Sequence, residues 1–228
     1  MKPQIEIEVV SDVVCPWCYI GKRRLEKAVE ELKNQYDVKV SFSPFELNPD
    51  MPAEGVNQKQ YLIKKFGNEQ RYQQLIGNVT NVAKEEGLVF NYDLQTISPN
   101  THEAHRMIWF AAEEGKQPAV KEALMKAYFE EGVDLSKREN LIATGVSAGL
   151  DKDKLIAFIN SDRGLLEVAT AEGMNKQRGI SGVPFYIINN KYGISGAQAS
   201  ETFVKALTEI GQESSLQGEM CDVENQDC

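Results

Sequence analysis

The chain has 228 residues, and its contents of hydrophobic residues (42%) and charged residues (26%) are close to those of an average globular protein. This composition excludes a disordered chain, a collagen and a small disulfide scaffold, because enough apolar surface is present to bury a core. The formal net charge of −9 lacks the basic surplus that is typical of proteins that bind duplex nucleic acid or anionic membranes.

Two features of the sequence bear on its location in the cell. No segment approaches 18 consecutive apolar residues, so we expect no membrane-spanning helix. Near the N-terminus, Glu6 and Glu8 stand where a signal peptide needs an unbroken apolar stretch. We therefore expect a cytoplasmic protein that has neither nucleic acid nor a membrane as a partner.

The first 48 residues have the pattern of an α/β unit. Alternating polarity over residues 4–10 predicts a half-buried strand, and the pair Cys15 and Cys18 follows directly. Apolar residues at helical spacing then predict a helix to about Asn34, and a second alternating segment at residues 38–42 predicts another strand. The order strand, C-x2-C, helix, strand is typical of the start of a βαβ unit.

Residues 49–171 read as an all-helical insertion. Apolar residues recur at helical spacing over residues 58–86, 100–115, 117–132, 136–148 and 152–173. Several of these segments are followed by a glycine that is typical of a helix end, namely Gly87, Gly115, Gly132 and Gly149. Asn100 or Thr101, and also Asp151, are the predicted N-terminal caps.

The α/β pattern returns at about residue 172. Pro184 precedes an apolar run at residues 185–188, Asn189-Asn190 predicts a hairpin turn, and a returning strand and a helix over residues 200–210 follow. We therefore predict one discontinuous domain made of residues 1–48 and 172–212. The remaining residues 213–228 carry acids and no bases, which predicts a flexible acidic tail that contains a C-x6-C pair.

The spacing of Cys15 and Cys18 is suited to disulfide exchange. A thiol at a helix N-terminus is near unpaired N–H groups and the positive end of the helix dipole, and both favour the ionised nucleophile. Cys15 is thus expected to be the more exposed and more acidic thiol, which attacks, and Cys18, one turn later, resolves. Pro16 suits the first helical position. Pro16 and Trp17 tune the redox balance and are expected to contact the substrate.

Pro184 is the second part of the predicted active site. A proline at the start of a strand, after Gly182-Val183, is a candidate for a cis peptide bond. That geometry is expected to present the backbone of Val183 to a substrate chain.

Three segments together resemble the DsbA superfamily, and more closely the FrnE-like thiol oxidoreductases. They are Ser11-Asp12-Val13-Val14-Cys15-Pro16-Trp17-Cys18-Tyr19-Ile20-Gly21-Lys22, residues 98–106 (SPNTHEAHR), and Gly182-Val183-Pro184-Phe185 with residues 192–198 (YGISGAQ). The resemblance covers residues 4–212. It implies a thioredoxin-like fold with a helical insertion, a redox centre at Cys15 and Cys18, a cis-proline at Pro184, and disulfide exchange with protein thiols.

The chain departs from the DsbA pattern at two positions. The well-known periplasmic members have a histidine between the cysteines, where this chain has Pro16-Trp17. Many thioredoxin-fold enzymes also have a buried acid six positions before the first cysteine, which moves protons for the second cysteine. Val9 occupies that position here, so another group or water must take this role.

The other two cysteines leave several interpretations open. Cys221 and Cys228 are either a second redox pair that exchanges electrons with Cys15 and Cys18, or an inert pair of thiols or a tail disulfide. All four cysteines together have the ligand number of a zinc site, but such a site would occupy the catalytic thiols. We therefore predict no metal site.

His102 and His105 are three residues apart on a predicted helix. No further ligand motif accompanies them, so helix-terminal hydrogen bonds or a place beside Cys15 are favoured over a metal site. His105, together with Arg106, is a candidate substrate contact.

Two other functions compete with an oxidoreductase. Glutathione-dependent isomerases and transferases of the hydroxychromene-carboxylate and kappa type have a similar fold but use a serine where this chain has Cys15. A redox-sensing binding module or chaperone would use the thiols as a switch without turnover. The preferred hypothesis needs no cofactor, although glutathione is a candidate reductant, and it leaves open whether the protein forms a homodimer.

Overall fold

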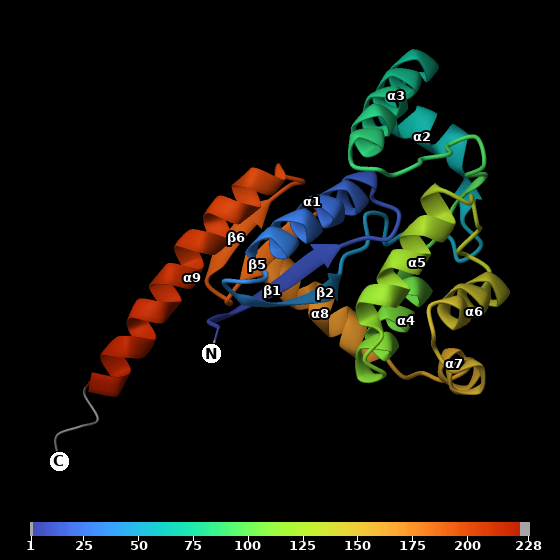
Figure 1. Cartoon of the computed structure of the whole chain (residues 1–228). Coiled ribbons are helices and arrows are strands. Elements are labelled where there is room, and N and C mark those ends of the chain that lie inside the picture. Colours follow the sequence, from blue (N-terminus) through green and yellow to red (C-terminus); the bar gives the residue numbers. More distant parts are fainter. Residues whose placement is uncertain (1, 224–228) are drawn as a thin grey trace.

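The computed structural model describes residues 2–223 of the chain, with side chains described for residues 2–213. A four-stranded sheet in the order β2-β1-β5-β6 lies at the centre of one half of the molecule (Figure 1). β1 (Gln4–Ser11) pairs in parallel with β2 (Asp37–Pro44) and antiparallel with β5 (Phe185–Ile188). β5 in turn pairs antiparallel with β6 (Tyr192–Ser195). The predicted strands are thus confirmed.

The hairpin between β5 and β6 turns at two asparagines. Asn189 and Asn190 have φ values of 49° and 53°, and the N–H of Lys191 donates to the carbonyl of Ile188 at 3.0 Å. Two consecutive residues with positive φ make a type I′ turn, whose twist matches that of the strands, and asparagine tolerates this conformation well. The turn predicted at this point is confirmed.

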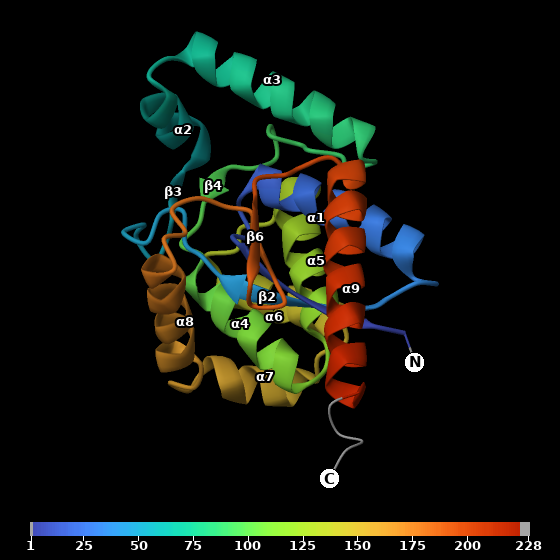
Figure 2. The ribbon, with the colours of Figure 1, turned by 90° about the vertical axis from the view of Figure 1, so that its left-hand side faces the viewer.

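One face of the sheet is covered by α1 (Pro16–Leu32) and α9 (Ser200–Val223). Apolar residues from β1, β5 and these two helices form a buried cluster that includes Ile7, Leu25 and Phe203. Figure 2 shows α9 running lengthwise beside this part of the molecule. The sequence predicts a helix end at residue 210 and an irregular tail from 213, but the helix continues to Val223. Residues 211–223 contain no proline and many good helix formers, which explains the extension.

Helices dominate the segment between β2 and β5. They are α2 (Gln58–Phe66), α3 (Glu69–Glu85), α4 (His102–Glu113), α5 (Gln117–Phe129), α6 (Arg138–Ser147), α7 (Lys152–Ile159) and α8 (Leu165–Gln177). Two short strands, β3 (Val56–Asn57) and β4 (Ile97–Ser98), pair antiparallel among them. In Figure 1, α4 to α7 lie beside the sheet, and α2 and α3 form a hairpin above α1.

Two of the predicted helices are each split into two. The predicted helix at 58–86 is broken at Gly67 (φ 102°), and Asn68 caps α3 by accepting the N–H of Arg71 at 2.8 Å. The predicted helix at 152–173 is broken at 160–164, where Gly164 has a φ of 81°. Since α8 runs from Leu165 to Gln177, the domain boundary predicted at residues 171 and 172 falls inside a helix. Asparagine with a neighbouring glycine, the signal of the first break, is easily passed over within a strong helical pattern.

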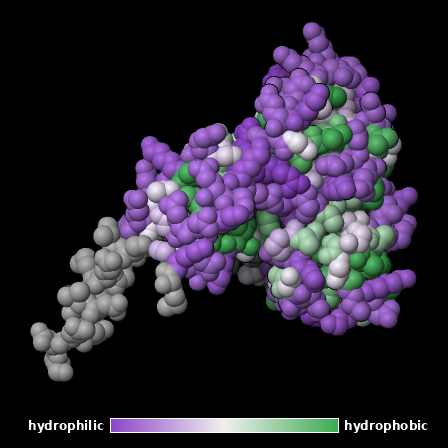
Figure 3. Space-filling model, viewed as in Figure 1, coloured by the Kyte–Doolittle hydropathy of each residue, from purple (hydrophilic) through white to green (hydrophobic). Residues whose placement is uncertain are grey.

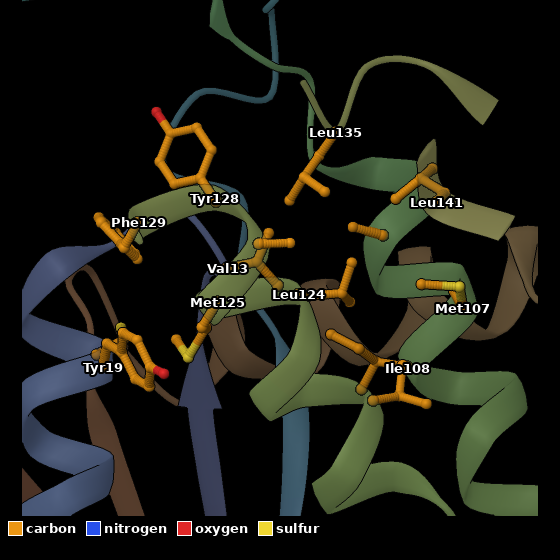
Figure 4. Packing of buried hydrophobic residues seen from close by; sticks show 14 of the residues in the cluster. Val13, Tyr19, Met107, Ile108, Leu124, Met125, Tyr128, Phe129, Leu135 and Leu141 are labelled. Carbon is orange, nitrogen blue, oxygen red and sulfur yellow. The ribbon is translucent and has the colours of Figure 1, made fainter. Parts of the chain in front are cut away.

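A second, larger hydrophobic cluster joins the insertion to the start of α1. It contains Cys15, Cys18 and Tyr19 together with buried residues of α4 to α7. Figure 4 shows its centre, where Val13 lies among Leu124, Met125 and other side chains from the insertion. α1 therefore belongs to both clusters: its first turns pack on the insertion and its later turns on the sheet and α9.

Gly21 lets α1 approach the strand that follows Pro184. A Cβ atom at Gly21 would overlap the Tyr186 hydroxyl and lie 3.2 Å from Pro184 Cγ. Gly21→Ala is therefore expected to lower the free energy of unfolding by about 1–3 kcal/mol through overpacking. Urea denaturation measures the change.

The matched control is Gly77→Ala in α3, because nothing lies within 4 Å of the added Cβ. That substitution should raise the free energy of unfolding by about 0.5–1 kcal/mol, the usual advantage of alanine within a helix. Stabilisation by both substitutions would show that α1 is not held closely against Tyr186.

Hydrophilic residues cover most of the face shown in Figure 3, and hydrophobic ones gather in smaller patches, mainly over the helical insertion. Across residues 2–223, no helix is both long enough and apolar enough to span a bilayer.

Candidate active site at Cys15 and Cys18

The two cysteines lie at the start of α1. Cys15 is the N-cap residue with extended backbone angles (φ −89°, ψ 111°), and Pro16 occupies the first turn. The N–H of Cys18 donates to the carbonyl of Cys15 at 3.0 Å, which places Cys18 one turn into the helix. Both are free thiols. Cys15 was expected to be the more exposed thiol, but the difference is small: Cys15 is 4% exposed and Cys18 is 2% exposed.

The loop before β5 lies against Cys15. The Val183–Pro184 peptide bond is cis, and the Cys15 thiol donates to the carbonyl of Val183 at 3.7 Å. Trp17, between the two cysteines, is 39% exposed. The fold thus brings Val183 next to Cys15, although the two are far apart in sequence. Trp17, which we expect to contact the substrate, lies in the same helix start as Cys15.

A cavity of about 340 Å³ opens beside Cys15. Cys15, Pro16, Trp17 and Val183 form one wall of it. The opposite walls come from the insertion and are mostly apolar, with Leu62, Phe66, Ile76, Tyr92 and Phe129 among them. The sequence indicated no role for these insertion residues, because their apolar spacing is equally typical of a helix core.

Cys18 faces the interior of the protein. Burial raises the pKa of the Cys18 thiol well above its usual value, and the neighbouring Cys15 raises it further. Lys121 and a backbone hydrogen bond from Asp12 act in the opposite direction. Cys18 therefore needs help from its surroundings to ionise.

Lys121 of α5 is a buried cation close to this thiol. It is 1% exposed, and its Nζ donates to the carbonyl of Ser11 at 3.4 Å. Burial lowers the pKa of Lys121 to about 8, although Cys18 and Asp12 raise it in part. We did not predict a role for Lys121 from the sequence. Its position on the same helix face as the buried Met125 and Tyr128 is the signal that would have found it.

Asp12 and His105 form a second buried polar pair. Asp12 Oδ1 lies 3.3 Å from His105 Nε2, and Asp12 Oδ2 accepts the N–H of Leu47 at 2.8 Å. His105 is 2% exposed and is not part of the wall of the cavity beside Cys15. The contact with substrate that the sequence predicts for His105 is therefore replaced by a contact with Asp12, because α4 turns this side chain inward.

The other residues of this helix start have structural partners. Arg106 donates to the carbonyls of Ser161 and Arg163 and pairs with Glu103, and His102 Nδ1 lies 3.1 Å from Glu46 Oε1. Among the described residues, no group of three or more histidine, cysteine or acidic side chains is arranged to hold a metal ion.

Replacing Lys121 by methionine should stabilise the protein at pH 7. Removal of a buried ammonium group is expected to raise the free energy of unfolding by about 1–3 kcal/mol. Because the folded-state pKa is near 8 and the unfolded one near 10.4, the unfolded state binds more protons between these values. The free energy of unfolding of the natural protein should therefore rise relative to that of Lys121→Met as the pH increases from about 8 to 10.4.

Urea denaturation at pH 7 and pH 10 measures this change, with Lys126→Met as the control. Lys126 lies on the same helix, and its side chain is 55% exposed. A Lys121→Met variant that is less stable than Lys126→Met at pH 7 would contradict the expected cost of the buried charge.

Comparison with known proteins identifies the family to which this fold belongs. The sequence model of the DSBA-like thioredoxin domain matches residues 6–208. The chain belongs to this family. The helical insertion expected from the sequence is present, and it lies between β2 and β5 of the DSBA-like thioredoxin domain.

Proteins from several bacteria are similar along most of their length. Protein YwbO of Bacillus subtilis (strain 168) is 27% identical over 217 residues, which cover 90% of this chain and 96% of YwbO. The crystal structure of probable DsbA oxidoreductase SCO1869 from Streptomyces coelicolor is 32% identical with a TM-score of 0.84, and covers 90% of this chain and 89% of that one. Cytosolic disulfide reductase DsbM from Pseudomonas aeruginosa, solved with GSH, shares the fold at 15% identity (TM-score 0.60; 94% and 99% covered).

The predicted second redox pair, Cys221 and Cys228, lies outside the residues whose side chains the structure describes. The backbone of Cys221 lies within α9, its side chain is not among those described, and Cys228 lies beyond the described residues. Its role stays a prediction.

Proposed function

We propose that this DsbA-like oxidoreductase exchanges disulfides with protein substrates through Cys15 and Cys18. The observation that carries the proposal is the pair of free thiols at the start of α1, with Cys15 at the cavity wall beside Val183 and Cys18 buried behind it. This arrangement separates a thiol that meets the substrate from one that resolves.

The exchange proceeds in two steps. The Cys15 thiolate attacks one sulfur of a substrate disulfide, and the other substrate sulfur leaves with the electron pair as a thiolate. The Cys18 sulfur then attacks Cys15, which releases the second substrate thiol and leaves a Cys15–Cys18 disulfide. The reverse sequence oxidises a substrate dithiol. In the reductive direction, two molecules of glutathione supply the electrons that restore the free thiols.

The cavity beside Cys15 supports a polypeptide substrate. Its walls are mainly apolar, and Lys65 is the cationic side chain among the residues that line it. We propose that the cysteine of an extended substrate segment enters there, next to Trp17 and Val183. Cytoplasmic location belongs to the same proposal and is supported by the cytosolic DsbM, which shares the fold. Membership of the FrnE-like group is also proposed, and it rests on the three sequence segments named above.

The test is a titration of the purified protein in glutathione redox buffers, with free thiols counted by mass after alkylation. One two-electron transition at Cys15 and Cys18, together with catalysed oxidation or reduction of a reduced or scrambled test protein, is the expected result. A second transition that disappears in a Cys221→Ser, Cys228→Ser variant would establish the proposed tail pair.

Three outcomes would overturn the proposal. Thiols that become reactive only after a chelator is added would indicate a zinc site. Glutathione-dependent isomerase activity that survives Cys15→Ser would indicate the isomerase class. Tight binding of a partner without multiple turnover would indicate a redox-sensing module.

A further inference from the structure

Cys18 has to lose a proton before it can resolve a mixed disulfide, and its surroundings make this difficult. The Cys18 thiol is 2% exposed, and the position six residues before Cys15 holds Val9, which offers no acid or base. The buried carboxylate of Asp12 is already engaged by His105 and by the N–H of Leu47. A different group must therefore handle this proton.

Lys121 and Cys18 are joined through one peptide unit. The carbonyl of Ser11 accepts a hydrogen bond from Lys121 Nζ at 3.4 Å. The backbone N–H of the next residue, Asp12, lies close enough to the Cys18 sulfur to lower the pKa of this thiol. The amine and the thiol thus lie at the two ends of the same peptide group, the amine at its carbonyl and the thiol towards its N–H.

Lys121 also lines a second cavity, to which Cys15 does not contribute. This cavity of about 40 Å³ is lined by Lys121 and His105 and extends to Glu167 of α8, which is exposed. This volume is sufficient for a water molecule, and the polar groups of its wall suit one. A proton can therefore leave Lys121 through a cavity that neither Cys15 nor the other residues of the larger cavity line.

We propose that Lys121 takes the proton of Cys18 during resolution and returns it when the Cys15–Cys18 disulfide is reduced. In the forward direction, the neutral amine of Lys121 becomes an ammonium group as the Cys18 thiol becomes a thiolate. The Cys18 sulfur then bonds to the Cys15 sulfur, the substrate sulfur leaves with the electron pair, and the ammonium group releases its proton through the small cavity. This inference rests on the proposed function.

The charges around Lys121 come from several elements. Cys15 caps α1, Cys18 and Lys22 belong to α1, and Asp12 follows β1. His105 of α4 and Glu167 of α8 line the shared cavity. Burial lowers the pKa of Lys121 to about 8, so that a neutral fraction exists near neutral pH, as a proton acceptor requires.

The first experiment measures the two chemical steps separately as a function of pH. Attack by Cys15 is measured as formation of a mixed disulfide with a model disulfide in the Cys18→Ser background. Resolution is measured as the release of a thiol from the mixed disulfide in a single turnover. Lys121→Met is compared with Lys126→Met, the exposed lysine of the same helix.

We expect Lys121→Met to slow resolution by about 10²-fold or more at pH 7 and to leave attack within about threefold of the natural rate. The pH profile of resolution should lose its inflection near pH 8 and rise only at the higher pH where Cys18 ionises unaided. Lys126→Met should retain both rates. An unchanged resolution profile, or equal slowing of both steps, would overturn the proposal.

A second measurement does not depend on turnover. In the Cys15→Ser background, the pKa of Cys18 is obtained from the pH dependence of its alkylation. Addition of Lys121→Met should raise this pKa by about one pH unit or more, since the neighbouring positive charge is lost. An unchanged pKa would overturn the role of Lys121, whereas absence of exchange in the natural protein alone would overturn the proposed function.

Discussion

Replacing Cys18 by serine should leave the protein covalently attached to its substrates through Cys15. The serine hydroxyl is not a nucleophile for disulfides at neutral pH, so the mixed disulfide forms and is not resolved. Turnover is expected to fall on the order of 10³-fold or more, because the two thiols act as one unit. Non-reducing electrophoresis and intact mass measure the adduct, and oxidation of a reduced test protein measures turnover.

The Cys15→Ser variant is the matched control for this trapping. It retains Cys18, which is 2% exposed and lies behind Cys15, so no adduct is expected. The double variant should resemble Cys15→Ser. An adduct on Cys18 in the absence of Cys15 would reverse the roles that we assign to the two thiols.

Asp12→Ala should cause one of the largest losses of stability in the chain. Asp12 is fully buried, and its loss leaves the Leu47 N–H and the His105 ring without their acceptor. Removal of one partner from a buried charged pair usually lowers the free energy of unfolding by about 3–5 kcal/mol. Urea denaturation at pH 7 measures this loss, and Asp50→Ala, at an exposed loop position, should stay within about 0.5 kcal/mol of the natural protein.

The same carboxylate contributes to acid sensitivity. Burial would raise the pKa of Asp12, but the hydrogen bond and charge of His105 and the Leu47 N–H hold it below its ordinary value. A lowered folded-state pKa stabilises the protein above the unfolded value near 3.9, and this stabilisation is lost as the pH falls through the folded value. The free energy of unfolding of Asp12→Ala should therefore fall less steeply below about pH 4 than that of the natural protein. Equal slopes for the two proteins in this pH range would contradict this account.

The proposed redox centre could be predicted from the sequence because its signals are local. Cys15, Pro16 and Cys18 occupy three positions of one helix start, and each is favoured there by backbone geometry. Pro184 likewise precedes a short apolar strand whose turn residues are adjacent. Patterns of this kind need no knowledge of the tertiary structure.

The surroundings of Cys18 were not predictable in the same way. Lys121 comes from α5 and Asp12 from the loop before α1, and only the packing of the insertion on α1 places them together. His105 showed the reverse problem: its sequence neighbourhood indicated a site residue, but the rotation of α4 buries it against Asp12. A charged residue on an apolar helix face becomes informative only when its partner is known.

The hydrophobic cluster that contains Cys15 and Cys18 also contains most of the buried side chains of α4 to α7. Elements that share one core tend to open together, as a single cooperative unit. We therefore expect amide protons in the first turns of α1 to exchange with solvent at the same free energy as those of α5, although the two helices are distant in the chain. A substitution that loosens the insertion would then also loosen the proposed redox centre, and native-state hydrogen exchange would show faster exchange in both elements.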